Sequence, residues 1–132
     1  MAALKLGYTI LYVENVELTL DFYQRAFGFK VKMMTTEKEY GELDTGNTAL
    51  AFATNSFVKI SNGIEFEEAS PTKVPPPVEL GFVTENVEAA YSRAIAAGAV
   101  SVKEPVQKPW GQYLGYVRDI NGFLVEICSP VS

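Results

Sequence analysis

The stretch YTILYVENVELTLDFYQRAFGF, residues 8–29, decides the fold because its first ten residues return later in the chain. YTILYVENVE (8–17) matches ELGFVTENVE (79–88), so that the letters ENVE recur at an offset of 85 − 14 = 71 residues. In both copies a strand-like apolar run precedes an Asn suited to cap a helix, and an acidic residue follows in the first turn. The two helical patterns end at Gly28 and Gly98. Each copy therefore predicts a strand followed by a helix.

A second pair of matching blocks extends the repeat. DTGNTALAF (44–52) matches DINGFLVEI (119–127) at an offset of 119 − 44 = 75 residues. Both read as a turn followed by a short strand, because Asn and Gly tolerate positive φ. Each half is therefore predicted as β-α-β-β-β, which gives an α+β fold of two tandem βαβββ units.

The domain organisation follows from the length and the position of the repeat. At 132 residues and 48% hydrophobic composition, residues 1–132 are expected to form a single domain. Its first unit covers about 5–55 and its second about 78–129. The linker of about 56–77 contains three consecutive prolines, which favour a stiff extended chain.

Composition excludes several classes of function. The net charge is −5 and no Lys/Arg cluster is present, which argues against nucleic acid or an anionic membrane as partner. No apolar run approaches the roughly 20 residues of a membrane span, and no signal-peptide pattern opens the sequence. A lone Cys128 excludes an internal disulfide and favours a cytoplasmic protein. The chain has no histidine, which excludes any mechanism that requires imidazole.

The repeat blocks and KPWGQYLGYVRDINGFLVEI (108–127) resemble the vicinal oxygen chelate superfamily of glyoxalase I, bleomycin resistance proteins and extradiol dioxygenases. The second stretch is similar to the family's Trp-Gly, Asp-x-x-Gly and terminal Glu pattern. The resemblance implies curved mixed sheets around a ligand cup, helices on the outer face, and a homodimer. It does not identify a reaction, because this scaffold hosts many functions.

Strand alternation predicts which side chains face the cup. Tyr8, Ile10 and Tyr12 share one face of the first strand, and the offset of the repeat places Glu79 and Gly81 on the equivalent face. The other members of this predicted face are Ala49, Ala51, Ala53, Val83, Leu124 and Glu126. Three alanines and a glycine leave room there, either for a ligand or for a closely packed second chain.

The resemblance also indicates where metal-dependent relatives hold their ion. Matched by motif, the four positions are Tyr8, Ala51, Glu79 and Glu126. Only Glu126 is a usual ligand, Ala51 has no donor atom, and transition-metal sites favour imidazole or thiolate. We therefore expect no metal and no cofactor, although two carboxylates with several waters remain compatible with magnesium.

Four further side chains are candidates for function. If Glu79 and Glu126 converge, their like charges raise one pKa, so that one is a general base or both neutralise a cationic ligand. The alternative is that Glu79 is an ordinary exposed carboxylate at the start of a strand. Trp110 either caps a core or contacts a planar or cationic ligand, as the Trp-Gly of bleomycin resistance proteins implies. Tyr113 is a candidate ligand contact, and the facing of Tyr113 and Tyr116 stays open.

Together these features predict a metal-independent binder of a small amphipathic, possibly cationic compound, of the antibiotic-sequestration type. One alternative is an acid/base isomerase, epimerase or lyase that uses Glu79 or Glu126 as its catalytic residue. Another is a non-catalytic interaction module whose alanine-lined face packs against another chain. A homodimer is expected under each hypothesis.

Overall fold

The computed structural model describes residues 2–131, which divide into two compact units. The first unit runs up to Gln24 and continues over Gly28–Glu68, and the second consists of Arg25–Phe27 and the chain from Ala69 onward. Within residues 2–131, no helix is long and apolar enough to cross a membrane.

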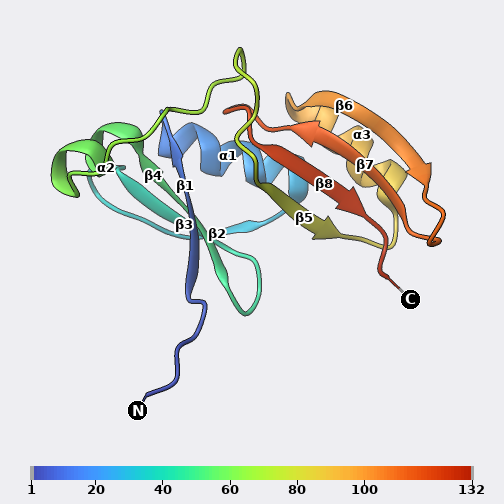
Figure 1. Cartoon of the computed structure of the whole chain (residues 1–132), viewed down its shortest axis with the longest axis horizontal. Coiled ribbons are helices and arrows are strands. Elements are labelled where there is room, and N and C mark those ends of the chain that lie inside the picture. The colour runs from blue at the N-terminus through green and yellow to red at the C-terminus, as the bar shows by residue number, and fades with distance from the viewer. Residues whose placement is uncertain (1, 132) are drawn as a thin grey trace. The chain divides into compact units, whose positions relative to one another are not determined.

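The first unit contains a four-stranded mixed sheet (Figure 1). The strands lie in the order β1-β4-β3-β2, with β1 parallel to β4 and the other pairs antiparallel. The elements in chain order are β1 (Tyr8–Val13), α1 (Val16–Phe27), β2 (Lys30–Met34), β3 (Tyr40–Asp44), β4 (Ala49–Thr54) and α2 (Asn55–Ser61).

The second unit repeats this topology, with the order β5-β8-β7-β6 and β5 parallel to β8. Its elements are β5 (Glu79–Val83), α3 (Val87–Ala97), β6 (Val100–Gln107), β7 (Tyr113–Arg118) and β8 (Leu124–Cys128). The predicted α+β class and the two tandem βαβββ units are confirmed.

The helix boundaries are those that the repeat predicts. Asn15 caps α1 by accepting a hydrogen bond of 2.9 Å from Leu18 N, and Asn86 caps α3 by accepting one of 3.1 Å from Ala89 N. Both helices end at a glycine in the left-handed region, Gly28 at φ 77° and Gly98 at φ 118°. These glycines end the helices without the steric cost of a Cβ atom.

The core of the first unit lies between α1 and one face of its sheet. The rings of Tyr23 and Phe52 are 5.0 Å apart, and α1 approaches β3 so closely at Gly41 that a Cβ there would lie 2.7 Å from Leu20 Cδ1. The buried residues Leu11 and Leu50 lie on the same side. The other side of this sheet, opposite α1, is called its distal face below.

In the second unit the sheet packs on α3, and its face opposite α3 is likewise called the distal face. Val117, Val125 and Ile127 are buried on the side of α3. The DINGF turn joins β7 to β8 around the buried Asp119, whose Oδ1 accepts hydrogen bonds of 2.9 Å from Asn121 N and Phe123 N.

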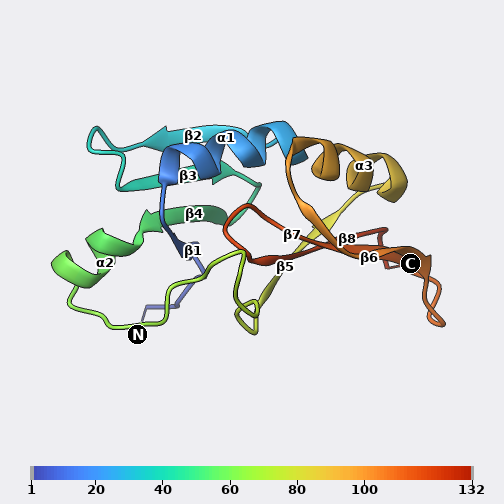
Figure 2. The ribbon, with the colours of Figure 1, turned by 90° about the horizontal axis from the view of Figure 1, so that it is seen from above.

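The segment predicted as a linker begins with a helix that the sequence pattern did not indicate. Thr54 caps α2, which follows directly on β4 (Figure 2), by accepting a hydrogen bond of 3.3 Å from Phe57 N. Lys59 in the last turn of α2 pairs with Glu68 at 2.6 Å, and beyond the helix the Phe66 ring packs 4.8 Å from that of Tyr12. This segment therefore covers part of the distal face of the first unit.

Candidate functional site

The distal face of the second unit brings together the two predicted acids. Strand register places Gly81 of β5 beside Glu126 of β8, and Glu126 beside Tyr116 of β7. Glu79 lies on the same face, two residues before Gly81. The Tyr116 hydroxyl donates a hydrogen bond of 2.9 Å to Glu126 Oε1. The site therefore contains two carboxyl groups and a phenol on three neighbouring strands.

The two acids are electrostatically linked. Partial burial of its carboxyl group, the negative charge of Glu126 and a hydrogen bond with Glu126 all raise the pKa of Glu79 above its ordinary value of 4.5. The hydrogen bond to Glu126 is also the main reason why the pKa of Tyr116 rises to about 12. Like charges at close range favour holding a proton between them. The Glu79–Glu126 pair is thus arranged either to hold a proton or to accept a cation.

Space is available beside this pair. A Cβ atom added to Gly81 would meet no heavy atom within 4 Å. Gly81 is extended backbone within β5, so the glycine is not required by backbone conformation. Its lack of a side chain leaves the surface next to Glu126 uncovered.

Cys128 ends β8 on the same face and is buried. Burial is the largest cause that raises the pKa of its thiol to about 11, and the neighbouring carboxyl of Glu126 contributes further. A thiol held protonated in this way is a poor nucleophile.

Tyr113 lies on the other side of the second sheet, because it alternates with Tyr116 along β7. Its hydroxyl donates a hydrogen bond of 2.5 Å to Glu88 Oε1, in the first turn of α3. The structure therefore places Tyr113 away from Glu79 and Glu126, whereas Tyr116, whose facing was left open, is hydrogen-bonded to Glu126.

Trp110 lies in the hairpin between β6 and β7 and is 64% exposed. Its indole N–H donates a hydrogen bond of 3.0 Å to Gln112 Oε1, and Gln112 Nε2 donates one of 3.0 Å to Ser129 O. The hydrogen bond orients the indole, and the ring surface stays accessible. Trp110 therefore does not cap a core.

The remaining candidates lie in the first unit. Tyr8 and Ile10 are exposed on the distal face, where their register partners are Ala49 and Ala51. Tyr12 is half-buried under Phe66, and Ala51 is fully buried. The eight predicted residues are thus divided equally between the units: Tyr8, Ile10, Tyr12 and Ala51 in the first, and Glu79, Trp110, Tyr113 and Glu126 in the second.

Sequence reasoning missed a buried acid on the distal face of the first unit. Glu42 is 9% exposed, lies beside Ala51 in the register, and accepts a hydrogen bond of 2.7 Å from the Tyr40 hydroxyl. Burial is the largest cause that raises the pKa of Tyr40, followed by the hydrogen bond to Glu42. The signal was present in YGELD (40–44), where Tyr40 and Glu42 alternate with small and apolar residues.

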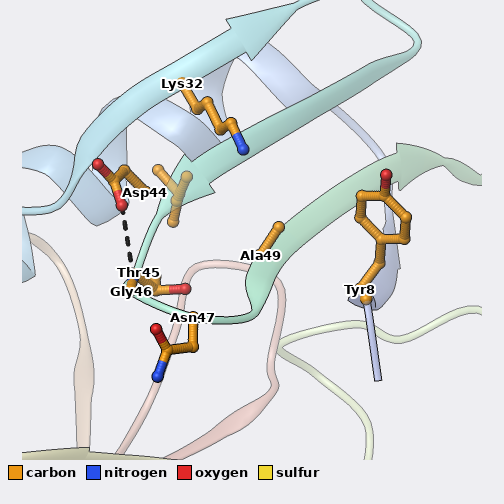
Figure 3. Close-up of a pocket in the computed structure, with 9 residues that line it drawn as sticks. Tyr8, Lys32, Asp44, Thr45, Gly46, Asn47 and Ala49 are labelled. Carbon is orange, nitrogen blue, oxygen red and sulfur yellow. Dashed lines mark hydrogen bonds between the residues drawn. The ribbon is translucent and has the colours of Figure 1, made fainter. Parts of the chain in front are cut away.

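A small cavity of about 170 Å³ opens at the end of this face (Figure 3). Tyr8, Lys32 and Ala49 contribute to it from β1, β2 and β4, and the Asp44–Asn47 turn closes one side. In that turn Asp44 Oδ1 accepts a hydrogen bond of 3.4 Å from Gly46 N, which is the dashed line in Figure 3.

A family model for the glyoxalase/bleomycin resistance protein/dioxygenase superfamily matches residues 5–127. The chain belongs to this superfamily. The resemblance read from the repeat and from residues 108–127 is therefore confirmed, and it extends over almost the whole chain. A search of curated proteins found no match.

Solved structures share the fold of this superfamily member at low identity. A glyoxalase-related enzyme from Fulvimarina pelagi is 21% identical, with a TM-score of 0.81 over 96% of this chain and 88% of that one. A glyoxalase/bleomycin resistance protein/dioxygenase family enzyme from Burkholderia phytofirmans PsJN is also 21% identical, with a TM-score of 0.79 over 98% and 100% of the two chains. TioX from Micromonospora sp. ML1 is 22% identical, with a TM-score of 0.72 over 95% and 98%.

Proposed function

We propose that the protein binds a small amphipathic cation and that the Glu79–Glu126 pair recognises the positive charge. The observation that carries this proposal is the raised pKa of Glu79 beside Glu126 on a face with open space at Gly81. An ammonium group placed between the two acids removes their mutual repulsion. The net charge of −5 favours approach of a cation in addition.

The apolar part of the ligand has suitable surfaces near the acids. Leu124 is half-buried on the distal face of the second unit, and Val83 is exposed at the end of β5. The exposed indole of Trp110 offers a flat surface in the same unit, and aromatic rings attract cations. An amphipathic molecule gains from both kinds of contact.

We infer further that the residues at the family's metal positions do not suit a transition metal. Ala51 has only a methyl group and Tyr8 offers a phenol. The two remaining donors are like-charged acids, and partial burial together with the charge of Glu126 raises the pKa of Glu79. Nickel, zinc and iron favour imidazole or thiolate ligands. Among residues 2–131, no group of three or more His, Cys, Asp or Glu side chains is placed to hold a metal ion.

The physiological role proposed for this binding is sequestration of a cationic antibiotic. The family includes bleomycin resistance proteins by name, and bleomycin is an amphipathic cation. Isothermal titration calorimetry of the purified chain against bleomycin and other cationic amphipathic antibiotics tests the role. Saturable binding is expected for at least one of them, weakened about tenfold in Glu126→Gln through loss of a charge-assisted contact.

The matched control for this titration is Glu104→Gln, which removes the same charge from an exposed position on β6. Its affinity should equal that of the wild type. No saturable heat with any compound of the panel would contradict the sequestration role.

A second function is favoured by one observation, the raised pKa of Glu79 beside an uncovered surface. An acid of raised pKa is suited to general acid/base catalysis without a metal, as in an isomerase, epimerase or lyase. A bell-shaped pH–rate profile that is lost in Glu126→Gln would favour this enzyme over the binding protein.

We also propose a homodimer. β1 and β5 are edge strands of their sheets, and Leu6, Tyr8 and Val83 on or beside them are exposed. Edge strands with apolar side chains favour pairing or cover by another chain. Light scattering at several protein concentrations measures the mass, and a monomer throughout would contradict this proposal.

A further inference from the structure

We propose that Asn62 is a site of spontaneous deamidation and that the carboxyl group formed there loosens the chain that follows α2. Residues 62–68 of that chain are called the Phe66 segment below. The proposal is independent of the function proposed above, because it involves neither Glu79 nor Glu126.

The dipeptide Asn-Gly occurs twice in the chain, at Asn62-Gly63 and at Asn121-Gly122. Asn-Gly is prone to deamidation because the backbone nitrogen of the glycine attacks the side-chain carbonyl carbon of the asparagine. A glycine has no side chain to hinder that approach. The structure places the two dipeptides in different surroundings, so that one is a reference for the other.

The reaction needs water and no other reactant. A C–N bond forms between Gly63 N and Asn62 Cγ, the bond from Cγ to the side-chain nitrogen breaks, and ammonia leaves with the proton of the Gly63 N–H. Water then hydrolyses the succinimide ring at either carbonyl, which gives aspartate or isoaspartate. Nothing is oxidised or reduced, and each event adds one carboxyl group to the chain.

The Asn62-Gly63 dipeptide is accessible to this reaction. Both residues are exposed, Asn62 as the C-cap of α2 and Gly63 directly after it at φ 66°. Among residues 2–131, neither the Gly63 N–H nor the Asn62 side chain has a hydrogen-bond partner. Gly63 also lines an open cavity of about 780 Å³, which leaves room for the ring and lets water reach it.

The Asn121-Gly122 dipeptide is protected in the DINGF turn. Gly122 is buried, and its N–H donates a hydrogen bond of 3.1 Å to Asp119 O, so that the attacking nitrogen is engaged. The turn is also crowded, because a Cβ at Gly122 would lie 2.5 Å from Ser70 O. Deamidation there requires the turn to open and proceeds only while it is open.

Lys59, in the last turn of α2, holds the Phe66 segment. Lys59 Nζ pairs with Glu68 Oε2 at 2.6 Å and lies 5.0 Å from the centroid of the Phe66 ring. The Phe66 ring in turn packs against the ring of Tyr12. These contacts keep the segment on the first unit.

A carboxyl group at position 62 weakens these contacts in two ways. It lies at the C-terminus of α2, where the helix dipole disfavours a negative charge. It also lies three residues after Lys59, a spacing at which an acid and a lysine pair on a helix, so that it competes with Glu68 for Lys59. The modified chain therefore has a more mobile Phe66 segment.

The first test compares the two dipeptides within one sample. The full chain is kept at mildly alkaline pH and then digested with trypsin, which separates Asn62 (in 60–73) from Asn121 (in 119–132). Mass spectrometry follows the conversion of amide to carboxyl, and enzymatic methylation detects isoaspartate. Deamidation in the folded chain should be at least about tenfold faster at Asn62, because Asn121 reacts only after a hydrogen bond is broken.

The same measurement in guanidinium chloride removes the effect of structure, and the two rates should then be similar. The proposal is overturned if the folded chain reacts equally fast at Asn62 and Asn121. It is also overturned if the folded chain does not react at Asn62 while the unfolded chain does.

Variants test the loosening of the Phe66 segment. Asn62→Asp carries the charge of the product, whereas Asn62→Gln keeps the amide. Glutamyl endopeptidase should cleave Asn62→Asp after Glu67 about two- to fivefold faster than Asn62→Gln, because cleavage follows the population of the open segment.

The matched control is Ser56→Asp, which adds the same charge at an exposed position in the first turn of α2. The helix dipole favours an acid there, so Ser56→Asp should not accelerate cleavage after Glu67. Equal cleavage of Asn62→Asp and Asn62→Gln would refute the loosening, as would equal acceleration by Ser56→Asp.

Discussion

The Tyr116 hydroxyl donates a hydrogen bond of 2.9 Å to Glu126 Oε1 across the neighbouring strands β7 and β8. The first unit has a Tyr–Glu hydrogen bond too, but within the single strand β3, from Tyr40 to Glu42 at 2.7 Å. In the equivalent registers Glu42 faces Ala51, whereas Tyr116 faces Glu126. Both units therefore have a phenol–carboxyl hydrogen bond on the distal face, but the residues that form it occupy different positions of the repeat.

Removal of the negative charge at Glu126 should change the titration of Tyr116. Glu126→Gln is expected to lower the pKa of Tyr116 from about 12 toward its ordinary value of 10.0, because the acceptor charge that stabilises the protonated phenol is gone. ¹³C NMR of the tyrosine rings measures this, with Tyr116→Phe to assign the signal. Glu104→Gln should leave the titration unchanged. An unchanged pKa in Glu126→Gln would contradict the hydrogen bond.

The raised pKa of Glu79 predicts a defined pH dependence of stability. Between 4.5 and its raised folded-state pKa the folded chain binds more protons at this residue than the unfolded chain, so the free energy of unfolding falls as pH rises through this range. Glutamine does not titrate, so Glu79→Gln lacks this pH-dependent loss of stability. Its free energy of unfolding should exceed that of the wild type above the raised pKa of Glu79 and equal it below pH 4.5. Urea unfolding at a series of pH values measures the difference, which is small because solvent screens the exposed side chain. A variant that is less stable at high pH would contradict the sign.

A larger residue at position 81 should leave folding intact but weaken ligand binding. A Cβ atom at Gly81 meets no heavy atom within 4 Å, and Gly81→Val should increase the free energy of unfolding by about 0.5–1 kcal/mol, since glycine is unfavourable within a strand. The same side chain should weaken binding of a cationic ligand about tenfold by filling the space beside Glu126. Thermal unfolding and calorimetric titration measure the two effects.

Gly122→Ala provides the contrast to this substitution. Its Cβ would lie 2.5 Å from Ser70 O, and the φ of 95° is unfavourable for alanine. A loss of about 1–3 kcal/mol in the free energy of unfolding is expected. If Gly81→Val were the more destabilising of the two variants, the open space at Gly81 would be refuted.

The helix α2 gives a prediction about stability in the first unit. Asn55 is buried, and its Oδ1 has no hydrogen-bond partner within residues 2–131. Asn55→Leu, of similar size, should raise the free energy of unfolding by about 1 kcal/mol because it removes an unsatisfied polar group. Thr54→Ala should lower it by about 1 kcal/mol through loss of the helix cap. Chemical denaturation measures both, and a loss of stability in Asn55→Leu would show that its side chain has a partner.

The fold was predictable where local signals repeat. Asn15 and Asn86 cap helices that end at Gly28 and Gly98, and these signals depend only on neighbouring residues. The helix α2 was not predictable in this way, because it is only seven residues long and its segment packs through the distant contact of Phe66 with Tyr12.

The site was predictable where one strand alternates regularly. Glu79 and Glu126 were placed on one face from strand alternation and the repeat offset, and the structure brings them together. Glu42 was missed because residues 40–44 were not assigned to a strand from the sequence. The face of the sheet on which Glu42 lies was therefore not predicted. The facing of Tyr113 stayed open because the start of β7, which sets its side of the sheet, depends on pairing with the neighbouring strands.

The most direct test of the central claim is the number of protons released when a cation binds the Glu79–Glu126 pair. Calorimetric titration with bleomycin, in two buffers of different ionisation enthalpy at the pH where Glu79 is half protonated, gives this number. We predict net proton release by the wild type, no release attributable to the pair in Glu79→Gln, and weaker binding in Glu126→Gln. Equal affinity and equal proton release in all three proteins would contradict the claim.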